Sequence, residues 1–198
     1  MPAEPVSAPV DRRADTRPAG LVLAAGAGRR FGGPKALARD RDGVPWIHRA
    51  VRALRDGGCD PVVVVLGAAA DEAAPLVPAG ASVTLAASWS DGVSASLRAG
   101  LAAVASTAAP AVVVVPVDTP ELPAAAVTRL VDRARSVALA YATYAGAPGH
   151  PALLGREHWD ALTGAVRGDV GAGPYLRAHR AEAVECGDLW SGADRDVP

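Results

Sequence analysis

The sequence predicts an α/β fold in which a doubly wound, mostly parallel sheet lies between two helix layers, a three-layer α/β/α arrangement. Two continuous valine-rich runs, at 61–67 and 111–118, are the first observation, because strands without polar alternation are covered on both faces. The second is the alternation of strand-like and helix-like segments, which favours parallel strands joined by right-handed crossovers. The third is the length of 198 residues, which suits one such domain.

The individual elements follow from local patterns in chain order. The apolar run at 20–25 stops at a glycine and predicts a buried first strand. The segment 45–58 begins with proline, ends in Gly-Gly and carries apolar residues at helical spacing, which predicts an amphipathic helix. Similar patterns predict later strands at 61–67, 82–87, 111–118, 137–144 and 182–186, and helices at 94–106, 123–136, 158–164 and 173–180. The glycine-rich stretch 145–175 is expected to form an irregular lid or a β-arm.

Composition and charge exclude several classes of protein. A net charge of −1 provides no general basic field for nucleic acid. No apolar run reaches the roughly 18 residues that a membrane helix needs, and the first residues lack the apolar core of a secretory signal. Residues 1–19 are expected to form a disordered arm and residues 20–198 the domain. Cys59 and Cys186 are too few for a disulfide framework, which favours a reducing cytoplasm.

Lys35 is the only lysine among the 20 basic residues, in a sequence that also contains no Asn and no Gln. This composition is typical of a GC-rich genome that replaces lysine by arginine. A lysine kept against that bias suggests a site where a compact ammonium on a flexible stem does what a guanidinium does not. Retention by chance is the alternative.

Lys35 ends a glycine-rich loop, LAAGAGRRFGGPK, that follows the first predicted strand. The loop is not the dinucleotide fingerprint, because Phe31 stands where the third glycine is needed, and it is not a P-loop, because no Ser or Thr follows the lysine. Gly26 and Gly28 still allow backbone N–H groups to turn toward an anion. The charges of Arg29 and Lys35 then point to a triphosphate bound together with a metal ion. The alternative is an ordinary strand-to-helix connection with solvated arginines.

This loop resembles the signature loop of the MobA-like nucleotidyltransferases, which have a Rossmann-like sheet, and its LAAG start is most similar to the molybdenum cofactor cytidylyltransferases. Three further stretches resemble segments of that family: WSDGVSASLRAGL at 89–101, GAPGHPALL at 146–154 and RGDVGAGPYL at 167–176. Together they cover the chain from Leu21 to its end. Two departures concern substrate contacts, because no Asn precedes the tryptophan and Gly173 stands where the family has Arg.

The resemblance implies a role for each candidate residue. The implied catalytic group is Lys35, Arg29 and Asp118. Nucleotide contacts are implied for the loop and for two serines at a helix start, namely Leu23, Ala24, Ala25, Gly26, Gly28, Arg29, Lys35, Ser94 and Ser96. Acceptor contacts are implied for Trp89, His150 and Asp169.

Asp118 follows a buried strand at the sheet edge where open α/β sheets bind their ligands, and a carboxylate there is solvated, caps a helix or holds a metal. The resemblance implies the last of these, because the matching aspartate of the family binds Mg²⁺. Magnesium takes one or two carboxylates with phosphate oxygens, and the resemblance implies that the second comes from the tail, Asp196 in preference to Asp194. Each candidate has an ordinary structural alternative. The alternatives are helix capping for the internal aspartates and serines, core packing for the tryptophan, a structural role for the histidine and solvation for the tail.

The activity that the resemblance implies is Mg²⁺-dependent transfer of CMP from CTP to the phosphate of a molybdopterin-type cofactor, with release of pyrophosphate. The implied protein partner is an apo-form molybdenum hydroxylase or the maturation chaperone of such an enzyme. Two alternatives stay open. One is a guanylyltransferase that uses GTP, with molybdenum cofactor or phospholactate as acceptor, and the other is a catalytically inactive module that binds the cofactor. No nucleic acid or membrane partner is expected.

Overall fold

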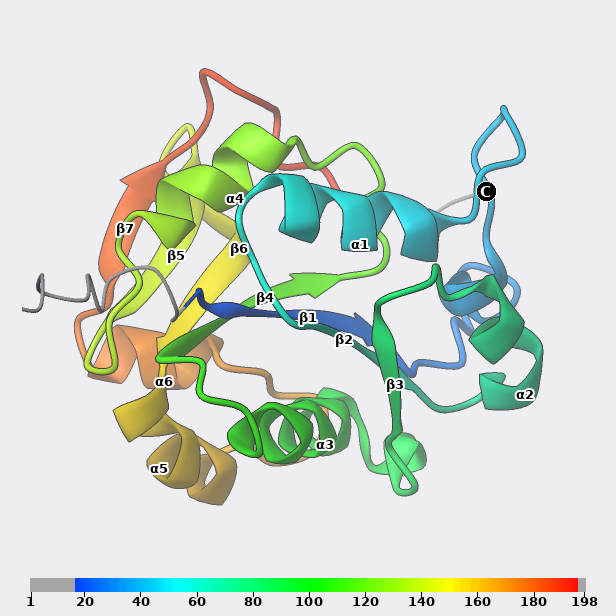
Figure 1. The fold of residues 1–198 in the computed structure, drawn as a ribbon, viewed down its shortest axis with the longest axis horizontal. Helices are drawn as coiled ribbons and strands as arrows, with labels where there is room; N and C mark the ends of the chain where they lie inside the picture. Colours follow the sequence, from blue (N-terminus) through cyan, green and yellow to red (C-terminus); the bar gives the residue numbers. More distant parts are fainter. Residues whose placement is uncertain (1–16, 196–198) are drawn as a thin grey trace, which may run out of the picture.

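A computed structural model describes residues 17–195, which contain one seven-stranded sheet (Figure 1). The strand order is β3-β2-β1-β4-β6-β5-β7. Within this described part, β6 is the strand that runs antiparallel to both of its neighbours, and the other pairs are parallel. The strands are β1 (Ala19–Ala24), β2 (Val62–Leu66), β3 (Ser82–Leu85), β4 (Ala111–Pro116), β5 (Leu139–Tyr144), β6 (Ala147–Gly155) and β7 (Glu182–Glu185).

Helices cover both faces of this sheet (Figure 1). One face carries α1 (Trp46–Asp56) and α4 (Ala124–Val131). The other face carries α3 (Val93–Ala105), α5 (Trp159–Ala165) and α6 (Gly173–Ala178). Short helical turns complete the chain: α2 (Ala70–Ala73), η1 (Lys35–Leu37), η2 (Ala74–Leu76), η3 (Trp89–Asp91) and η4 (Arg156–His158).

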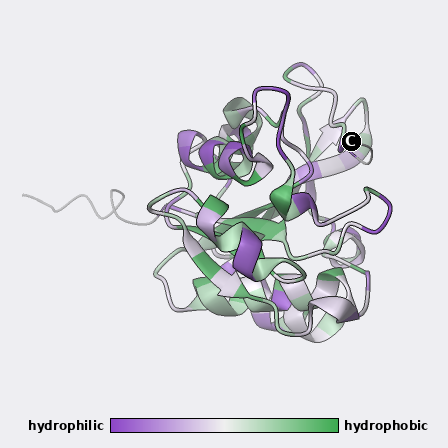
Figure 2. Ribbon diagram, turned by 90° about the vertical axis from the view of Figure 1, so that its right-hand side faces the viewer, coloured by the Kyte–Doolittle hydropathy of each residue, from purple (hydrophilic) through white to green (hydrophobic). Residues whose placement is uncertain are grey.

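The central strand β4 shows why the valine runs carry no polar alternation. Val113 and Val115 pack into the core beneath α1 and α4, whereas Val112 and Val114 pack into the core beneath α3, α5 and α6. None of these four side chains is more than 4% exposed. Hydrophobic residues accordingly concentrate in the central strands (Figure 2), and the predicted three-layer α/β/α fold is confirmed.

The expectation of an irregular lid or β-arm over 145–175 is wrong. Residues Ala147–Gly155 form β6, which lies inside the sheet between β4 and β5, and α5 and α6 follow it. Ala145 and Gly146, with φ of 51° and 81°, make the tight turn into β6. Residues 147–150 are largely exposed and only 151–155 are buried, so the prolines and glycines of the first half concealed the strand pattern.

Two predictions concern residues that the structure does not describe. Residues 1–16, most of the expected arm, and 196–198, which include Asp196, lie outside the described part. The first strand of the described part, β1, starts at Ala19. Within the described residues, no helix combines the length and apolar character needed to cross a membrane.

Candidate functional site

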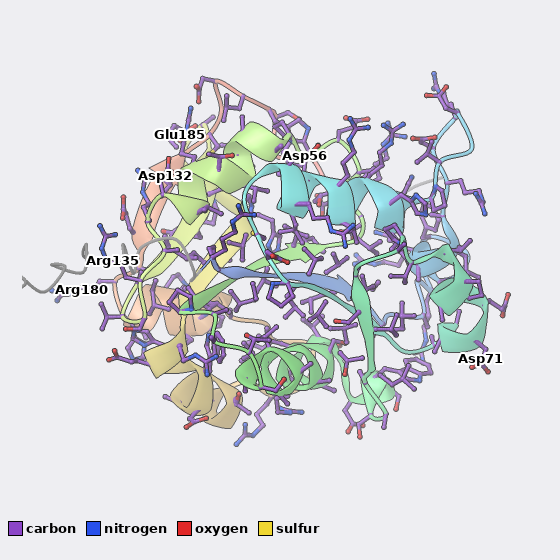
Figure 3. The ribbon with its side chains drawn as sticks, viewed as in Figure 1. Asp56, Asp71, Asp132, Arg135, Arg180 and Glu185 are labelled. Carbon is purple, nitrogen blue, oxygen red and sulfur yellow. The ribbon has the colours of Figure 1, made fainter. Side chains whose placement is uncertain are left out.

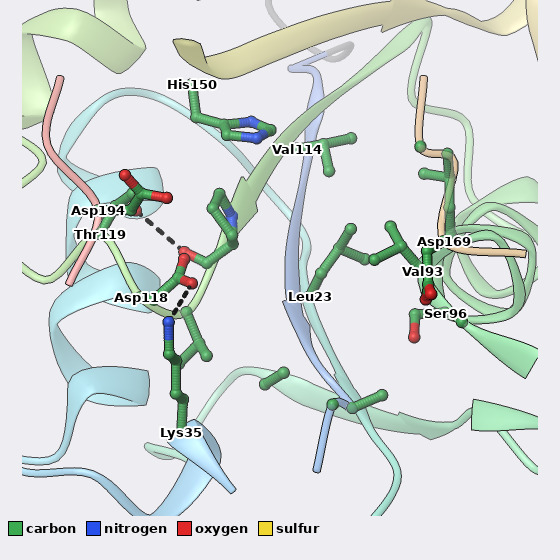
Figure 4. A pocket seen from close by; sticks show the side chains of 18 of the residues that line it. Leu23, Lys35, Val93, Ser96, Val114, Asp118, Thr119, His150, Asp169 and Asp194 are labelled. Atoms are coloured by element: carbon green, nitrogen blue, oxygen red, sulfur yellow. Dashed lines mark hydrogen bonds and ion pairs between the residues drawn. The ribbon is translucent and has the colours of Figure 1, made fainter. Parts of the chain in front are cut away.

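The carboxyl ends of β1 and β4 open into a cavity of about 1040 Å³ (Figure 4). Its walls come from the loop after β1, the η3–α3 junction, the end of β4, the start of β6, the loop before α6 and the tail after β7. Open α/β sheets usually bind ligands at this edge. Small-molecule pockets typically measure about 300–1,000 Å³, so this cavity has room for a nucleotide and a second substrate.

Most of the residues expected at the site share this cavity. Those that line it are Leu23, Ala24, Ala25, Gly26, Gly28, Arg29, Lys35, Trp89, Ser96, Asp118, His150, Asp169 and Asp194. Sequence segments more than a hundred residues apart therefore meet in one place.

The glycine-rich loop owes its shape to Gly28. The φ of Gly28 is 59°, and a Cβ there would overlap the carbonyl oxygen of Gly33. The Gly28 carbonyl oxygen accepts hydrogen bonds from the backbone N–H groups of residues 31–33 at 2.9 to 3.1 Å, which closes the loop on itself. Gly26 has open space around it and borders the cavity, so the backbone at this point can approach a ligand closely.

Lys35 and Asp118 form an ion pair at the cavity wall although they are 83 positions apart (Figure 4). Lys35 Nζ donates to Asp118 Oδ2 at 2.9 Å, and the two side chains are 14% and 22% exposed. The Lys35 ammonium also lies 5.7 Å from the centre of the Phe31 ring, within cation–π range. The end of the loop and the end of β4 are thereby joined through opposite charges.

Helix capping does not explain the internal aspartates and serines. The helix after Asp118 is α4, which begins at Ala124 without a side-chain cap. The N-cap residues of α3 and α6 are Gly92 and Ala172, again without side-chain caps. Asp118, paired with Lys35, and Asp169 therefore both border the cavity without capping a helix.

The residues around Asp118 fit a divalent cation. Asp194 lines the same cavity, and the tail is held there because the Arg195 N–H donates to the Asp118 carbonyl oxygen at 2.8 Å. The Arg195 side chain also forms an ion pair with Glu121. Two carboxylates beside space for phosphate suit Mg²⁺ or Mn²⁺. Residues 17–195 contain no cluster of three or more His, Cys, Asp or Glu able to hold a metal.

His150 lies near the same two carboxylates, at the end of the exposed half of β6 (Figure 4). The residue is accessible at the cavity opening, but its ring lies among protein groups, and the resulting desolvation lowers the pKa of His150. The negative charges of Asp118 and Asp194 act in the opposite direction without reversing this shift. The lowered pKa favours the neutral imidazole, which can donate one hydrogen bond and accept another.

Two glycines bring the segment before α6 against the start of α3. Gly92 has a φ of 97°, and a Cβ there would lie 2.5 Å from Asp169 Oδ1 and from the carbonyl carbon of Gly168. The Ser94 N–H donates to the Gly168 carbonyl oxygen at 3.0 Å. Asp169 and Ser96 consequently both face the cavity (Figure 4). Ser94 does not, since its side chain is fully buried away from the cavity lining, and the structure does not support the expected nucleotide contact from its hydroxyl.

Trp89 borders the cavity in η3 and does not serve only to fill the core. A Cβ on Gly67 would lie 2.7 Å from the Trp89 Cβ and 2.6 Å from the Ala25 carbonyl oxygen. Gly67 thus allows the tryptophan segment to pack directly against the glycine-rich loop.

Sequence reasoning missed two cavity arginines. Arg30 lines the cavity beside Arg29, and neither side chain has a hydrogen bond or ion pair to the residues that the structure describes. The adjacent pair of arginines was the available signal for Arg30. Arg177 lines the cavity from α6, and its Nη1 lies 3.4 Å from where a Cβ on Gly173 would be. Its guanidinium therefore lies over the position at which the expected family arginine is missing.

Fold and site together define an α/β domain whose glycine-rich loop, lysine and strand-end aspartate surround a ligand cavity. Residues 20–184 match the model of the MobA-like NTP transferase domain, and the chain belongs to this family. The family resemblance seen in the sequence is thereby confirmed.

Individual relatives extend over nearly the whole chain. The chain is 34% identical over 191 residues to the nicotine blue oxidoreductase of Paenarthrobacter nicotinovorans, which covers 90% of this chain and 91% of the relative. It resembles the crystal structure of Rv0371c from Mycobacterium tuberculosis H37Rv with a TM-score of 0.73 and 28% identity, over 86% of this chain and 87% of that one. A structure of the same mycobacterial protein in complex with manganese matches with a TM-score of 0.69 and 27% identity, over 92% and 91% of the two chains.

Proposed function

We propose that the protein is a metal-dependent nucleotidyltransferase that uses Mg²⁺ to transfer CMP from CTP to the phosphate of a molybdopterin-type cofactor. The observation that carries this proposal is the contact of Lys35 Nζ with Asp118 Oδ2 at 2.9 Å, in a cavity bounded by the glycine-rich loop. A cation suited to phosphates and a carboxylate suited to a metal lie side by side there. The manganese complex of Rv0371c supports the choice of a divalent metal.

The proposed reaction is an in-line displacement at phosphorus. An oxygen of the acceptor phosphate attacks the α-phosphorus of CTP, the bond from that phosphorus to the bridging oxygen of the β-phosphate breaks, and pyrophosphate leaves with the electron pair. Lys35, Arg29 and Arg30 stabilise the negative charge that develops on the leaving group. A divalent cation held by Asp118 and Asp194 would neutralise part of the triphosphate charge. A phosphate monoester is already ionised at pH 7, so the step needs no general base.

Other cavity residues receive binding roles under this proposal. Backbone groups of residues 23–26 and the Ser96 hydroxyl contact the nucleotide. His150, Asp169 and Trp89 contact the acceptor, with the neutral imidazole orienting it by hydrogen bonding. The product would pass in the cytoplasm to an apo-form molybdenum hydroxylase or to its maturation chaperone.

CTP is expected to bind more tightly than GTP, UTP or ATP. The chain has no Asn or Gln to read a base, so the choice depends on backbone groups or on Ser, Thr, Arg or Asp side chains that match one donor and acceptor pattern. One mismatched buried hydrogen-bonding group costs about 1–3 kcal/mol, which corresponds to a preference of about 5- to 150-fold. Calorimetric titrations with each nucleotide in the presence of Mg²⁺ or Mn²⁺ measure it, and thermal shifts with the same set provide a screen. Tighter binding of GTP would move the protein to the guanylyltransferase alternative.

Arg177→Ala is expected to raise the KM for the acceptor about tenfold while changing the KM for the nucleotide less than twofold. The expected cost follows from loss of one charge-assisted hydrogen bond, about 1.5–3 kcal/mol. Arg180→Ala is the matched control, because Arg180 lies outside the cavity lining, at the periphery of the molecule (Figure 3). Initial rates of pyrophosphate release against each substrate separate the two KM values. A rise confined to the KM for the nucleotide would place Arg177 on the nucleotide side, and an equal rise in both would contradict a specific contact with the acceptor.

Two alternatives to transfer of CMP have specific support. The absence of arginine at Gly173 favours an inactive cofactor-binding module, which would bind nucleotide without releasing pyrophosphate. The 34% identity to a nicotine blue oxidoreductase favours a redox activity on the same domain. Reduction of nicotine blue by the purified protein with NADH or NADPH, without any nucleotide-dependent pyrophosphate release, would support that second function.

A further inference from the structure

Tyr144 connects two separate segments of the cavity wall. It is the last residue of β5 and is 6% exposed. Its hydroxyl donates to the carbonyl oxygen of His150 at 2.6 Å. Its ring lies so close to Gly149 that a Cβ there would be 2.8 Å from ring carbons. The first half of β6, which presents His150 to the cavity, is therefore shaped by this one side chain.

The same ring also supports the tail after β7. A Cβ on Gly192 would lie 2.5 Å from the Tyr144 Cγ, and the φ of Gly192 is 78°, which disfavours any residue but glycine. Trp190 meets the Tyr144 ring edge-on, with ring centres 5.4 Å apart. The tail thus crosses one side of the tyrosine while β6 crosses another.

The tail is held again beyond this contact, where the Arg195 N–H donates to the Asp118 carbonyl oxygen at 2.8 Å. Asp194 lies between the two attachments and borders the cavity. Its carboxylate is carried by a segment without helix or strand, so its position depends on these attachments.

We propose that Tyr144 is a positioning residue that holds the His150 segment and the Asp194 tail together as one wall of the cavity beside Asp118. Through this contact it presents the Asp194 carboxylate to the divalent cation. The inference rests on the metal site of the proposed function. An aromatic residue that only filled the core would not need glycine at both neighbouring positions, Gly149 and Gly192.

Two variants of different severity test the inference. Gly192→Ala places a Cβ against the Tyr144 ring and is expected to displace the tail. Tyr144→Phe keeps the ring and removes only the hydrogen bond to His150. Gly43→Ala in the loop before α1 is the matched control for the glycine substitution, because Gly43 has nearly the same φ, 77°, and a Cβ there meets no atom within 4 Å.

The first measurement is amide hydrogen exchange followed by mass spectrometry, which requires neither metal nor activity. Gly192→Ala is expected to speed exchange about tenfold or more in the peptide that contains residues 190–195. Tyr144→Phe is expected to speed exchange of residues 145–150 about two- to tenfold, as loss of one neutral hydrogen bond allows. Gly43→Ala should leave both peptides unchanged.

The second measurement is Mn²⁺ affinity in the presence of CTP, by electron paramagnetic resonance. Removal of groups that orient metal ligands typically lowers metal affinity about 10–100-fold, and Gly192→Ala is expected to fall in this range. Unchanged tail exchange together with Mn²⁺ affinity within twofold of wild type would overturn the inference. Failure of the wild-type protein to bind Mn²⁺ would overturn the metal site of the proposed function instead. The exchange data would then still decide whether Tyr144 holds the tail, and Tyr144→Phe keeps that test open should Gly192→Ala not fold.

Discussion

Asp118→Ala is expected to abolish nucleotidyl transfer at every concentration of Mg²⁺ or Mn²⁺. Asp118 follows β4, a strand buried on both faces, so its carboxylate is the rigid ligand of the proposed metal site. Metal stabilisation of charge on a transferring phosphoryl group is worth several kcal/mol, so the loss should reach about 10³-fold. Pyrophosphate release across a metal titration measures it. Asp132→Ala, an exposed aspartate at the end of α4, is the control.

Asp194→Ala is expected to change the metal dependence of the reaction, whereas Asp118→Ala abolishes the reaction. Asp194 is carried by the tail, so its loss is expected to raise the metal concentration needed for half-maximal rate and to leave the maximal rate largely intact. Mn²⁺ should partly rescue the variant, because Mn²⁺ binds such sites more tightly than Mg²⁺. Deletion of residues 194–198 should mimic the substitution and also removes Asp196, the ligand preferred from the sequence. Full activity of the truncated chain at low Mg²⁺ would contradict a carboxylate contribution from the tail.

The layer architecture could be predicted because burial on both faces leaves a mark in the sequence. β2 and β4 each place alternate valines in opposite cores, and no polar residue interrupts either run. The sequence of β6 shows no such pattern. The exposed first half of this strand consists of residues that border the cavity or pack against nearby side chains. Pro148 and Gly149 line the cavity, and Gly149 also accommodates the Tyr144 ring. The residues that the site requires in this segment therefore conceal the hydrophobic pattern of a buried strand.

The site likewise contains a part that the sequence predicts and a part that it does not. Asp118 and the glycine-rich loop could be predicted, because the topology of a parallel sheet sends both strand ends to one edge. The contacts that hold the remaining wall could not, since they join residues distant in sequence, as when Tyr144 packs on Gly192 or Arg195 bonds to Asp118. Arg177 is the clearest case. Its guanidinium lies over Gly173, where the family has arginine, although Arg177 is one helical turn further along the chain. A motif with fixed spacing would not detect this replacement.

Lys35→Ala is expected to lower kcat/KM for the nucleotide about 10- to 150-fold, the equivalent of about 1.5–3 kcal/mol for one charge-assisted contact to a phosphate. In the structure the Lys35 ammonium lies 2.9 Å from Asp118 Oδ2 and compensates the negative charge of that carboxylate. With Asp118 engaged by a divalent cation, the same ammonium would be directed to the phosphate oxygens. Melting temperature is measured in parallel, so that loss of contact is distinguished from loss of fold.

Lys35→Arg decides why the chain keeps its one lysine. The Lys35 side chain is 14% exposed and its ammonium lies near the Phe31 ring, so the longer, planar and differently hydrated guanidinium of arginine would not place its charge at the same point beside Asp118. A loss of about tenfold or more is expected although the charge is kept. The reverse exchange at a position outside the cavity lining, Arg41→Lys in the exposed loop before α1, should leave the rate unchanged. Normal kinetics of Lys35→Arg would mean that genome composition, and not phosphate chemistry, left the lysine there.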